Sequence, residues 1–340
     1  MNKFVLRQSL LLFLTAVIWG VAFVAQSAGM DYVGPFTYNG TRCILGGAVL
    51  IPCIIFLKRI QGKTEGIVES GHAEKTEQEN RQMFAGQRRL LLTGGLCCGI
   101  ILFVASSLQQ LGIQYTSVGK AGFITAMYIL LVPVLGLFVG KRAGWKVWLG
   151  VAFAVCGLYK LCMDIDLNTV LADANTYGFS YVWDNGAQYG IAFGKGDALL
   201  LACALIFSLH ILVIDYFSPR VDGVKMSCIQ FWVCGILCMA CAAMFESPRW
   251  SSILAAWKPV CYGGIMSCGI AYTLQIVGQK DMNPTVASLI LSLESVVSVV
   301  AGFLILHQTM SARELFGCLL MVVAIVLAQL PDRRDKCMME

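Results

Sequence analysis

The sequence predicts an all-α integral membrane protein whose ten transmembrane helices form two five-helix repeats that face opposite ways in the bilayer. Three observations predict this fold: an apolar composition, apolar stretches of membrane-spanning length, and an internal repeat. Of the 340 residues, 58% are hydrophobic and only 13% are charged, whereas a soluble domain is about 45–50% apolar and about 25% charged. A water-soluble core could not absorb this much apolar sequence, so the bilayer is the expected solvent.

Apolar stretches of about 20 residues recur along nearly the whole chain. At about 1.5 Å rise per residue, each is long enough to cross a hydrocarbon layer of about 30 Å. The stretches are continuously apolar rather than alternating, which excludes a transmembrane β-barrel. The expected spans are 8–28, 35–57, 89–112, 117–139, 145–163, 196–215, 224–245, 258–278, 285–306 and 312–330.

The first span follows Lys3 and Arg7 and superficially resembles a secretory signal. It has no convincing cleavage site and further spans follow it, so we expect an uncleaved first helix. In the fourth span, Pro133 removes one backbone hydrogen bond and predicts a kink that would suit a gate. In the ninth, Pro284 predicts the first turn of the helix.

Two connections are longer than the others. Residues 58–88 are polar and charged, and we expect a flexible cytoplasmic loop there. Residues 164–195 are acidic and aromatic, and we expect a partly ordered extracytoplasmic loop. The first repeat is therefore expected over residues 1–163 and the second over 196–330, followed by a cytoplasmic tail at 331–340.

The distribution of basic residues predicts the orientation, because Lys and Arg are enriched in cytoplasmic segments. With both termini placed inside, eighteen Lys and Arg residues fall in inner segments and four in outer segments. The asymmetry supports an even number of spans and a plasma-membrane protein with both termini in the cytoplasm. The net charge of +5 is thus a topology signal, and no nucleic-acid partner is expected.

An internal repeat emerges when residues 108–161 are aligned with 274–328. Five helices separate equivalent points, so the second copy must be inverted, which is an architecture of secondary transporters with a central site exposed alternately to each side. Two fused repeats would complete a pore within a monomer. The paired residues are Leu108/Leu274, Gln109/Gln275, Gly112/Gly278, Ala121/Ala287, Ile124/Ile290 and Gly136/Gly302. The earlier parts of the two repeats align more weakly, and their pairs are Ile18/Ile206, Trp19/Phe207, Arg42/Gln230 and Gly47/Gly235.

Three segments, taken in order, resemble the EamA-like family of the drug/metabolite transporter superfamily. They are residues 16–23 (AVIWGVAF), residues 115–142, and residues 283–294 (NPTVASLILSLE) leading into 315–328. The resemblance implies ten helices, a central cavity and export or uptake of small metabolites such as amino acids. Family members often carry a Pro after the carboxylate of the ninth helix and then an acidic residue. Here Ser295 and His307 take those places, which leaves the coupling mechanism open.

Two ionisable residues lie near the middle of spans, where each costs about 2.5–3.5 kcal/mol on insertion scales and needs a partner, water or a ligand. Glu294 in the ninth span is a candidate carrier of a coupling proton or ion, and Arg42 in the second span is a candidate for an anionic substrate group. The structural alternative is that Arg42 and Glu294 pair with each other and fix helix packing.

Lys120, one turn into the fourth span, is a candidate for holding an anionic group in the outer vestibule, or a lysine that snorkels to the interface. Tyr128 falls opposite Glu294 in the repeat alignment and lies two turns from Lys120, so the two are expected to share the cavity wall. Hydrogen bonds between membrane helices explain most of the other polar candidates without a ligand. Those candidates are Trp19, Thr125, Gln230, Asn39, Gln109, Gln110, His210 and Gln275.

Other functional classes have weaker sequence support. Most of the fifteen Cys lie inside apolar runs without matching His or carboxylate clusters, so neither a disulfide scaffold nor a metal site is expected. No phosphate-binding Gly-Lys-Ser or Gly-Lys-Thr loop occurs, and no cofactor is expected. An intramembrane enzyme would need clustered carboxylates, a His pair or an activated nucleophile, and is the alternative from another class; a non-transporting sensor subunit is the third.

Overall fold

The computed structural model describes residues 3–65, 77–115, 118–141, 144–162, 167–178, 180, 194–306 and 312–329. Within these ranges every regular element is a helix. The helices are α1 (Lys3–Met30), α2 (Pro35–Glu65), α3 (Glu77–Ile113), α4 (Val118–Ala126), α5 (Tyr128–Phe138), α6 (Trp145–Cys162), α7 (Leu167–Tyr177), α9 (Lys195–Phe217), α10 (Gly223–Phe245), α11 (Trp250–Ala255), α12 (Trp257–Cys261), the π-helix η1 (Tyr262–Tyr272), α13 (Thr273–Gln279), α14 (Pro284–Leu291), α15 (Leu293–Leu306) and α16 (Ala312–Gln329).

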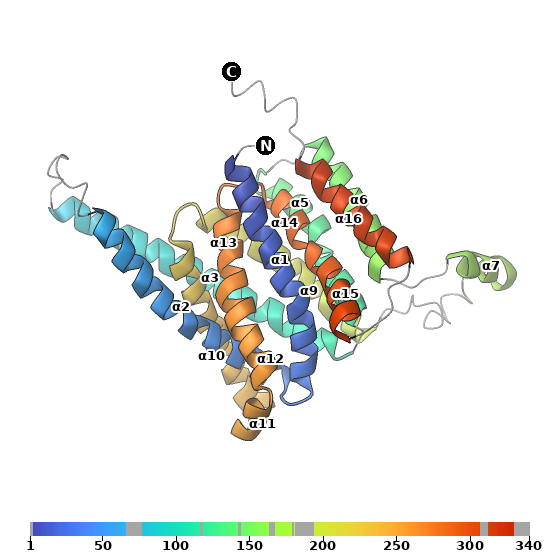
Figure 1. Cartoon of the computed structure of the whole chain (residues 1–340), viewed down its shortest axis with the longest axis horizontal. Helices are drawn as coiled ribbons and strands as arrows, with labels where there is room; N and C mark the ends of the chain where they lie inside the picture. The colour runs from blue at the N-terminus through green and yellow to red at the C-terminus, as the bar shows by residue number, and fades with distance from the viewer. Residues whose placement is uncertain are drawn as a thin grey trace, which may run out of the picture.

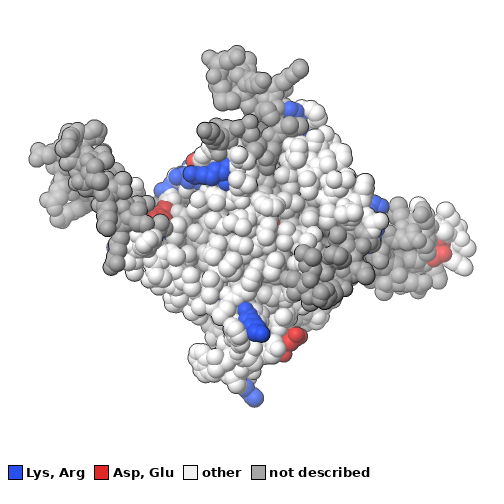
Figure 2. All heavy atoms as spheres, in the orientation of Figure 1, with Lys and Arg blue, Asp and Glu red and all other residues white. Residues whose placement is uncertain are grey.

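Six helical segments in the described part of the chain are long and apolar enough to cross a membrane. Three shorter apolar helices, Ile124–Phe138, Pro284–Ser298 and Leu315–Leu327, accompany them. Large apolar side chains such as Phe56 and Leu319 lie exposed on the outside of the bundle, and the middle of the surface in Figure 2 is almost free of charge. These features describe a multi-pass membrane protein.

The helices form one bundle in which distant segments lie side by side (Figure 1). The most extensive packing joins α6 to α16, α2 to α10, and α3 to α9 and α10, while α1 packs along α15 and η1. The first residues of α1 and the last of α16 lie at one end, which we call the N/C end. The opposite end carries α11 and is called the α11 end (Figure 1).

The connections differ from the sequence prediction. The loop predicted at 58–88 is wrong in extent, because α2 continues to Glu65 and α3 begins at Glu77; only 66–76 lie outside the described residues. Lys, Arg, Gln and Glu dominate both extensions, and these residues are good helix formers in water. In the stretch 164–195 the structure places the helix α7, which stands apart from the bundle (Figure 1).

The fourth and ninth spans are each interrupted near the middle. The break between α4 and α5 lies at Met127 (φ −60°, ψ −11°) and that between α14 and α15 at Ser292 (φ −62°, ψ −11°). The fourth helix thus breaks six residues before Pro133, at which a kink was predicted, and Pro133 itself lies inside α5. Pro284 begins the ninth span as predicted, and the Asn283 side chain caps it by accepting the N–H of Thr285 at 2.9 Å.

The eighth span contains a π-helical segment, η1, that the sequence did not predict. Its glycines let it approach α2 closely. A Cβ on Gly263 would lie 2.9 Å from the hydroxyl oxygen of Tyr38, and one on Gly264 would lie 2.7 Å from Leu45 Cδ2. Because π-helical segments are uncommon and are often found at functional sites, η1 marks this wall of the bundle as a candidate functional site.

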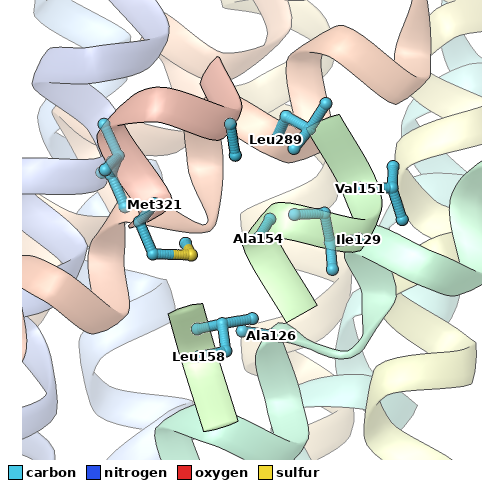
Figure 3. Packing of buried hydrophobic residues seen from close by; sticks show 10 residues of the cluster. Ala126, Ile129, Val151, Ala154, Leu158, Leu289 and Met321 are labelled. Atoms are coloured by element: carbon cyan, nitrogen blue, oxygen red, sulfur yellow. The ribbon is translucent and has the colours of Figure 1, made fainter. Parts of the chain in front are cut away.

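Two apolar cores flank the middle of the bundle. One joins α1, the broken spans, α6 and α16 around Ile129, Leu158, Leu289 and Met321 (Figure 3). The other joins α2, α3, α10 and η1, and its members include Phe231 and five buried cysteines. The space between these cores holds the site described next.

Candidate functional site

A central cavity lies between α1, α2, α3, both broken spans, α9 and the eighth span. The cavity has a volume of about 40 Å³, room for about three water molecules. In this conformation the cavity is therefore too small for a metabolite. Its lining residues are Trp19, Phe23, Gln26, Arg42, Gln109, Thr125, Tyr128, Phe207, Ile211, Ser267, Tyr272, Gln275, Leu291 and Glu294.

The two helix breaks meet at this cavity through Tyr128 and Glu294. Tyr128 is the first residue of α5, and Glu294 lies in the first turn of α15. The Tyr128 hydroxyl donates a hydrogen bond of 3.1 Å to Oε1 of Glu294. Glu294 therefore lines the cavity from a position directly after the break at Ser292.

Arg42 reaches the same cavity from α2, but it does not pair with Glu294. The Arg42 guanidinium lies 5.5 Å from the ring centroid of Tyr38, a cation–π contact. No ion pair joins Arg42 to Glu294, although both side chains are buried, with exposed fractions of 3% and 5%. The structural alternative for these two residues, a mutual ion pair, is thus contradicted.

Several polar atoms of the lining have no hydrogen-bond partner within the described protein. Buried polar groups in folded proteins are nearly always paired, so each exception calls for an explanation. Five such atoms belong to residues that line this one cavity, which indicates a surface suited to a polar ligand or to water. The atoms are Trp19 Nε1, Gln26 Oε1, Arg42 Nε, Thr125 Oγ1 and Gln275 Oε1.

Of the candidates from the sequence, Asn39, Gln110, His210 and Gln230 do not line the cavity. Asn39 instead donates from Nδ2 to the carbonyl oxygen of Ser106 at 3.0 Å, which joins α2 to α3. Gln230 Oε1 lies 3.3 Å from Nε2 of His210, which joins α10 to α9. Lys120 lies in α4, but its side chain is outside the described part of the structure, as is all of His307.

The sequence reasoning missed several lining residues, notably Phe207, Tyr272 and Ser267. For Phe207 a signal existed, because the repeat alignment pairs it with Trp19. Tyr272 had no such signal, since it lies in the unpredicted η1 segment, where its ring packs 4.6 Å from that of Trp19 and 5.4 Å from that of Phe231.

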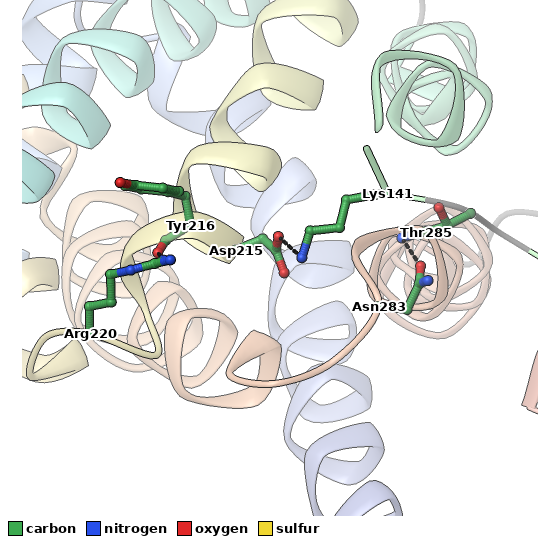
Figure 4. A network of polar contacts seen from close by, with 6 residues as sticks. All are labelled: Lys141, Asp215, Tyr216, Arg220, Asn283 and Thr285. Atoms are coloured by element: carbon green, nitrogen blue, oxygen red, sulfur yellow. Dashed lines mark hydrogen bonds and ion pairs between the residues drawn. The ribbon is translucent and has the colours of Figure 1, made fainter. Parts of the chain in front are cut away.

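Polar contacts join helices at both ends of the bundle. At the N/C end Lys141 Nζ lies 2.8 Å from Asp215 Oδ2, joining the end of the fourth span to α9 (Figure 4). At the α11 end the Glu246 carboxylate accepts the backbone N–H groups of Phe36 (2.8 Å) and Thr37 (2.9 Å) and the Thr37 hydroxyl. Glu246 follows α10, so it holds the start of α2 against the end of α10.

The thiols near α2 form no metal site in the described residues. Cys43 Sγ donates a weak hydrogen bond to Cys234 Sγ across 3.6 Å, and both thiols are buried. They lie in the apolar core that joins α2 to α10, which agrees with a packing role.

Similarity to other proteins extends along nearly the whole chain. A solved crystal structure at 18% identity covers 97% of this chain and 98% of its own, with a TM-score of 0.69, which shows the fold alone. An uncharacterized transporter of Archaeoglobus fulgidus is 25% identical over 93% of this chain and 84% of its own. A chloroplastic WAT1-related protein of Arabidopsis thaliana is 22% identical over 93% of this chain and 68% of its own.

The family model described as the EamA-like transporter family matches this chain twice, over residues 6–162 and 194–330. The two matches cover most of the chain, and they fall on either side of the stretch that contains α7. They confirm the resemblance noted in the sequence. With its multi-pass helical fold and its buried central cavity, the chain belongs to the EamA-like transporter family of membrane transporters.

Proposed function

We propose that this transporter carries small zwitterionic metabolites, amino acids or similar compounds, by alternating access of two inverted five-helix repeats. The observation that carries the proposal is the central cavity, where a buried Arg42 and a buried Glu294 face one space without pairing. If Arg42 and Glu294 were paired with each other, little of their charge would be left to bind a ligand. Two separate buried charges of opposite sign suit a ligand that brings one charge of each sign.

Reciprocal helix contacts support the inverted repeat. A Cβ on Gly112 would lie 2.7 Å from Leu200 Cγ, and one on the equivalent Gly278 would lie 3.0 Å from Leu12. The offset that pairs Trp19 with Phe207 also makes Leu12 equivalent to Leu200. Gly112 thus packs against Leu200, and its equivalent Gly278 packs against Leu12, which is equivalent to Leu200. This exchange is expected for two halves related by a twofold axis.

The helices nearest that proposed axis show the same reciprocity. A Cβ on Gly47 would lie 3.0 Å from Trp232 Cδ1, and one on Gly235 would lie 2.8 Å from Ile44 Cγ1. Gly47 is equivalent to Gly235 and Ile44 to Trp232, so α2 and α10 contact each other through equivalent surfaces. The two matches of the family model support the same division of the chain.

The cavity lies where such an axis would pass. Ten of its fourteen lining residues form five equivalent pairs, and the Tyr128–Glu294 hydrogen bond joins the members of one of them. A site on the axis can be opened by either half in turn, which is the geometric requirement for alternating access. The pairs are Trp19/Phe207, Phe23/Ile211, Gln109/Gln275, Thr125/Leu291 and Tyr128/Glu294.

The walls also suit an amino acid with an apolar side chain. We assign the substrate carboxylate to Arg42 and its ammonium group to Glu294, with Trp19, Phe207 and Tyr272 around the remainder. In this assignment Glu294 can bind either the substrate ammonium or a coupling proton, which would link substrate exchange to a proton gradient. The small volume of the cavity agrees with a closed conformation between two open ones.

The proposal places the N/C end in the cytoplasm of a plasma-membrane protein, because most of the Lys and Arg residues lie there. One chain supplies every lining residue of the cavity, so a monomer is sufficient for the cycle. Export and uptake use the same geometry and differ only in the gradients.

The test is flux through reconstituted liposomes. Accumulation of a mixed metabolite panel is recorded by mass spectrometry, with and without an imposed pH gradient, for wild type, Glu294→Gln and Arg42→Gln. We expect amino acids among the transported compounds, at least a tenfold loss of flux with Arg42→Gln, and gradient-driven accumulation that disappears with Glu294→Gln.

Asn39→Ala is the matched control, because Asn39 is a buried polar residue of the same helix as Arg42 but does not line the cavity. It should lose stability but keep the substrate pattern of the wild type. Full transport with unchanged pH dependence in Glu294→Gln would reject the coupling role, and flux of purely anionic or purely cationic compounds alone would reject the zwitterion assignment.

A further inference from the structure

Two adjoining cavities lie at the N/C end, separate from the central cavity. Their volumes are about 310 Å³ and 500 Å³, and none of their described lining residues lines the central cavity. Their common wall consists of Val221, Asp222, Lys225 and Lys280, from the turn before α10, from α10 and from the end of α13. We call the two together the basic cleft.

The basic cleft gathers far more positive than negative charge. Among its described lining residues, the single carboxylate belongs to Asp222. It is already bound, because its Oδ2 lies 2.9 Å from Lys225 Nζ and its Oδ1 accepts the N–H groups of Val224 and Lys225. Figure 2 shows blue Lys and Arg atoms gathered on the upper part of the surface, at this end. The lining cations come from six different segments and are Arg7, Lys58, Arg88, Arg220, Lys225 and Lys280.

A buried hydroxyl lies in the wall of the same cleft. Ser218 is 2% exposed, lines the 310 Å³ cavity, and its Oγ has no hydrogen-bond partner in the described protein. The enrichment of basic residues in cytoplasmic segments accounts for the cations of the cleft. It does not account for an unpartnered hydroxyl among them. A hydroxyl donor beside several cations is the arrangement that binds phosphate oxygens.

The deeper part of the cleft is apolar and lies next to the lipid-facing surface. Ile54, Ile276 and Val277 line the smaller cavity. Two residues further along α2 from Ile54, Phe56 is 64% exposed on the outside of the bundle. Leu92 of α3 follows the lining residue Leu91 and is exposed as well. A ligand with a phosphate head and an apolar tail would therefore find both of its parts matched.

We propose that the basic cleft is a binding site for an anionic phospholipid, whose phosphate lies among the cations near Ser218 and whose acyl chain covers Ile54. A free phosphate shares the head-group chemistry but leaves the apolar part of the cleft uncovered, so the lipid is the better match. The occupant joins the ends of α1, α2 and α3 to the α9–α10 turn and α13. Anionic lipid therefore ties the two halves of the chain together at the N/C end.

The test compares lipids of one chain length on the protein purified in neutral detergent. The midpoint of thermal unfolding is recorded against short-chain phosphatidylglycerol, phosphatidylcholine of the same chain length, glycerol phosphate and inorganic phosphate. We expect only phosphatidylglycerol to raise the wild-type midpoint, in proportion to the logarithm of its concentration above Kd.

Arg88→Gln/Lys280→Gln should weaken phosphatidylglycerol about thirtyfold, since each cation near a lipid head group contributes about fivefold. Ser218→Ala, which keeps every charge, should weaken it about fivefold. The matched control is Arg89→Gln/Lys258→Gln, which removes the same charge from exposed positions outside the cleft and should bind as the wild type does.

Two outcomes would overturn the site. Equal weakening in the control pair would mean attraction to general surface charge rather than a cleft. A midpoint shift from inorganic phosphate or glycerol phosphate as large as that from phosphatidylglycerol would assign the cleft to a soluble anion.

Discussion

Arg42 and Asn39 lie one turn apart on α2, and their environments show what sequence reasoning at the residue scale can supply. Depth in the membrane was predictable for both, because hydropathy marks the middle of a span. The direction of each side chain was not, because apolar residues surround these helices on all sides and no polar face marks the cavity. In the structure Arg42 lines the cavity together with Trp19, Thr125, Tyr128 and Glu294, whereas Asn39 donates to the carbonyl oxygen of Ser106 in α3.

Asp222 is a residue whose contribution to stability can be isolated. Burial alone would raise the pKa of its carboxyl group, but the hydrogen bonds and charge of Lys225 and the N–H of Val224 outweigh burial and hold the pKa below its ordinary value. A carboxyl whose pKa is lowered on folding stabilises the fold above its ordinary pKa. That stability is lost as the pH falls through the lowered value.

We expect Asp222→Ala to destabilise the protein by about 1 kcal/mol at pH 7, the usual cost of losing a helix N-cap. The deficit relative to wild type should shrink only below about pH 3.9, where an ordinary Asp begins to protonate. Thermal unfolding in detergent at several pH values measures it. Asp222→Asn keeps a capping oxygen and should retain most of the stability; an equal loss in both variants would mean that the ion pair with Lys225, not the cap, matters.

At the scale of elements, the helices were predictable but their interruptions were not. The breaks at Met127 and Ser292 are single-residue tightenings with nearly helical angles. Such a change costs little free energy and requires neither Gly nor Pro, so no residue pattern in the sequence predicts it. The η1 segment likewise has no recognisable sequence signal, because a π-helical turn uses ordinary apolar and small residues. The prediction for the charged ends of α2 and α3 was wrong for a different reason. Their polar composition was interpreted as a loop, although the residues themselves favour helix.

The link between α2 and α10 at the α11 end makes a second prediction. Glu246→Gln keeps the shape of the side chain but replaces a charged acceptor of the Phe36 and Thr37 N–H groups with a neutral one. We expect a loss of about 1–3 kcal/mol in unfolding free energy, read as a lower thermal midpoint. Thr37→Val, which removes only the hydroxyl contact, should cost less; the reverse order would contradict the role of the carboxylate.

At the scale of the whole molecule, the multi-pass helical fold follows from composition and the family follows from three sequence segments, whereas the substrate follows from neither. The cavity chemistry depends on which few polar side chains turn inward across seven spans. The basic cleft shows the same limit, because Arg7, Arg88 and Lys280 come from distant parts of the chain and only the folded bundle brings them to one cleft.

The orientation of the whole bundle can be tested with cysteine labelling. In a background with the exposed Cys53 and Cys156 changed to Ser, Lys258→Cys should react with a membrane-impermeant maleimide in intact cells. Arg89→Cys should react only after the cells are permeabilised, because it lies at the N/C end. The opposite pattern would invert the proposed topology.

The pairing of equivalent residues around the cavity has one more consequence, which concerns ancestry. A protein assembled from two identical short chains would carry every polar residue of its cavity twice, with two tyrosines or two glutamates facing each other across the axis. Joining the copies into one polypeptide frees each to mutate alone. Tyr128 can then bond to Glu294, and a single arginine can stand opposite a glutamine that has turned away to His210. In the proposed arrangement, such a cavity can distinguish the two ends of an asymmetric solute.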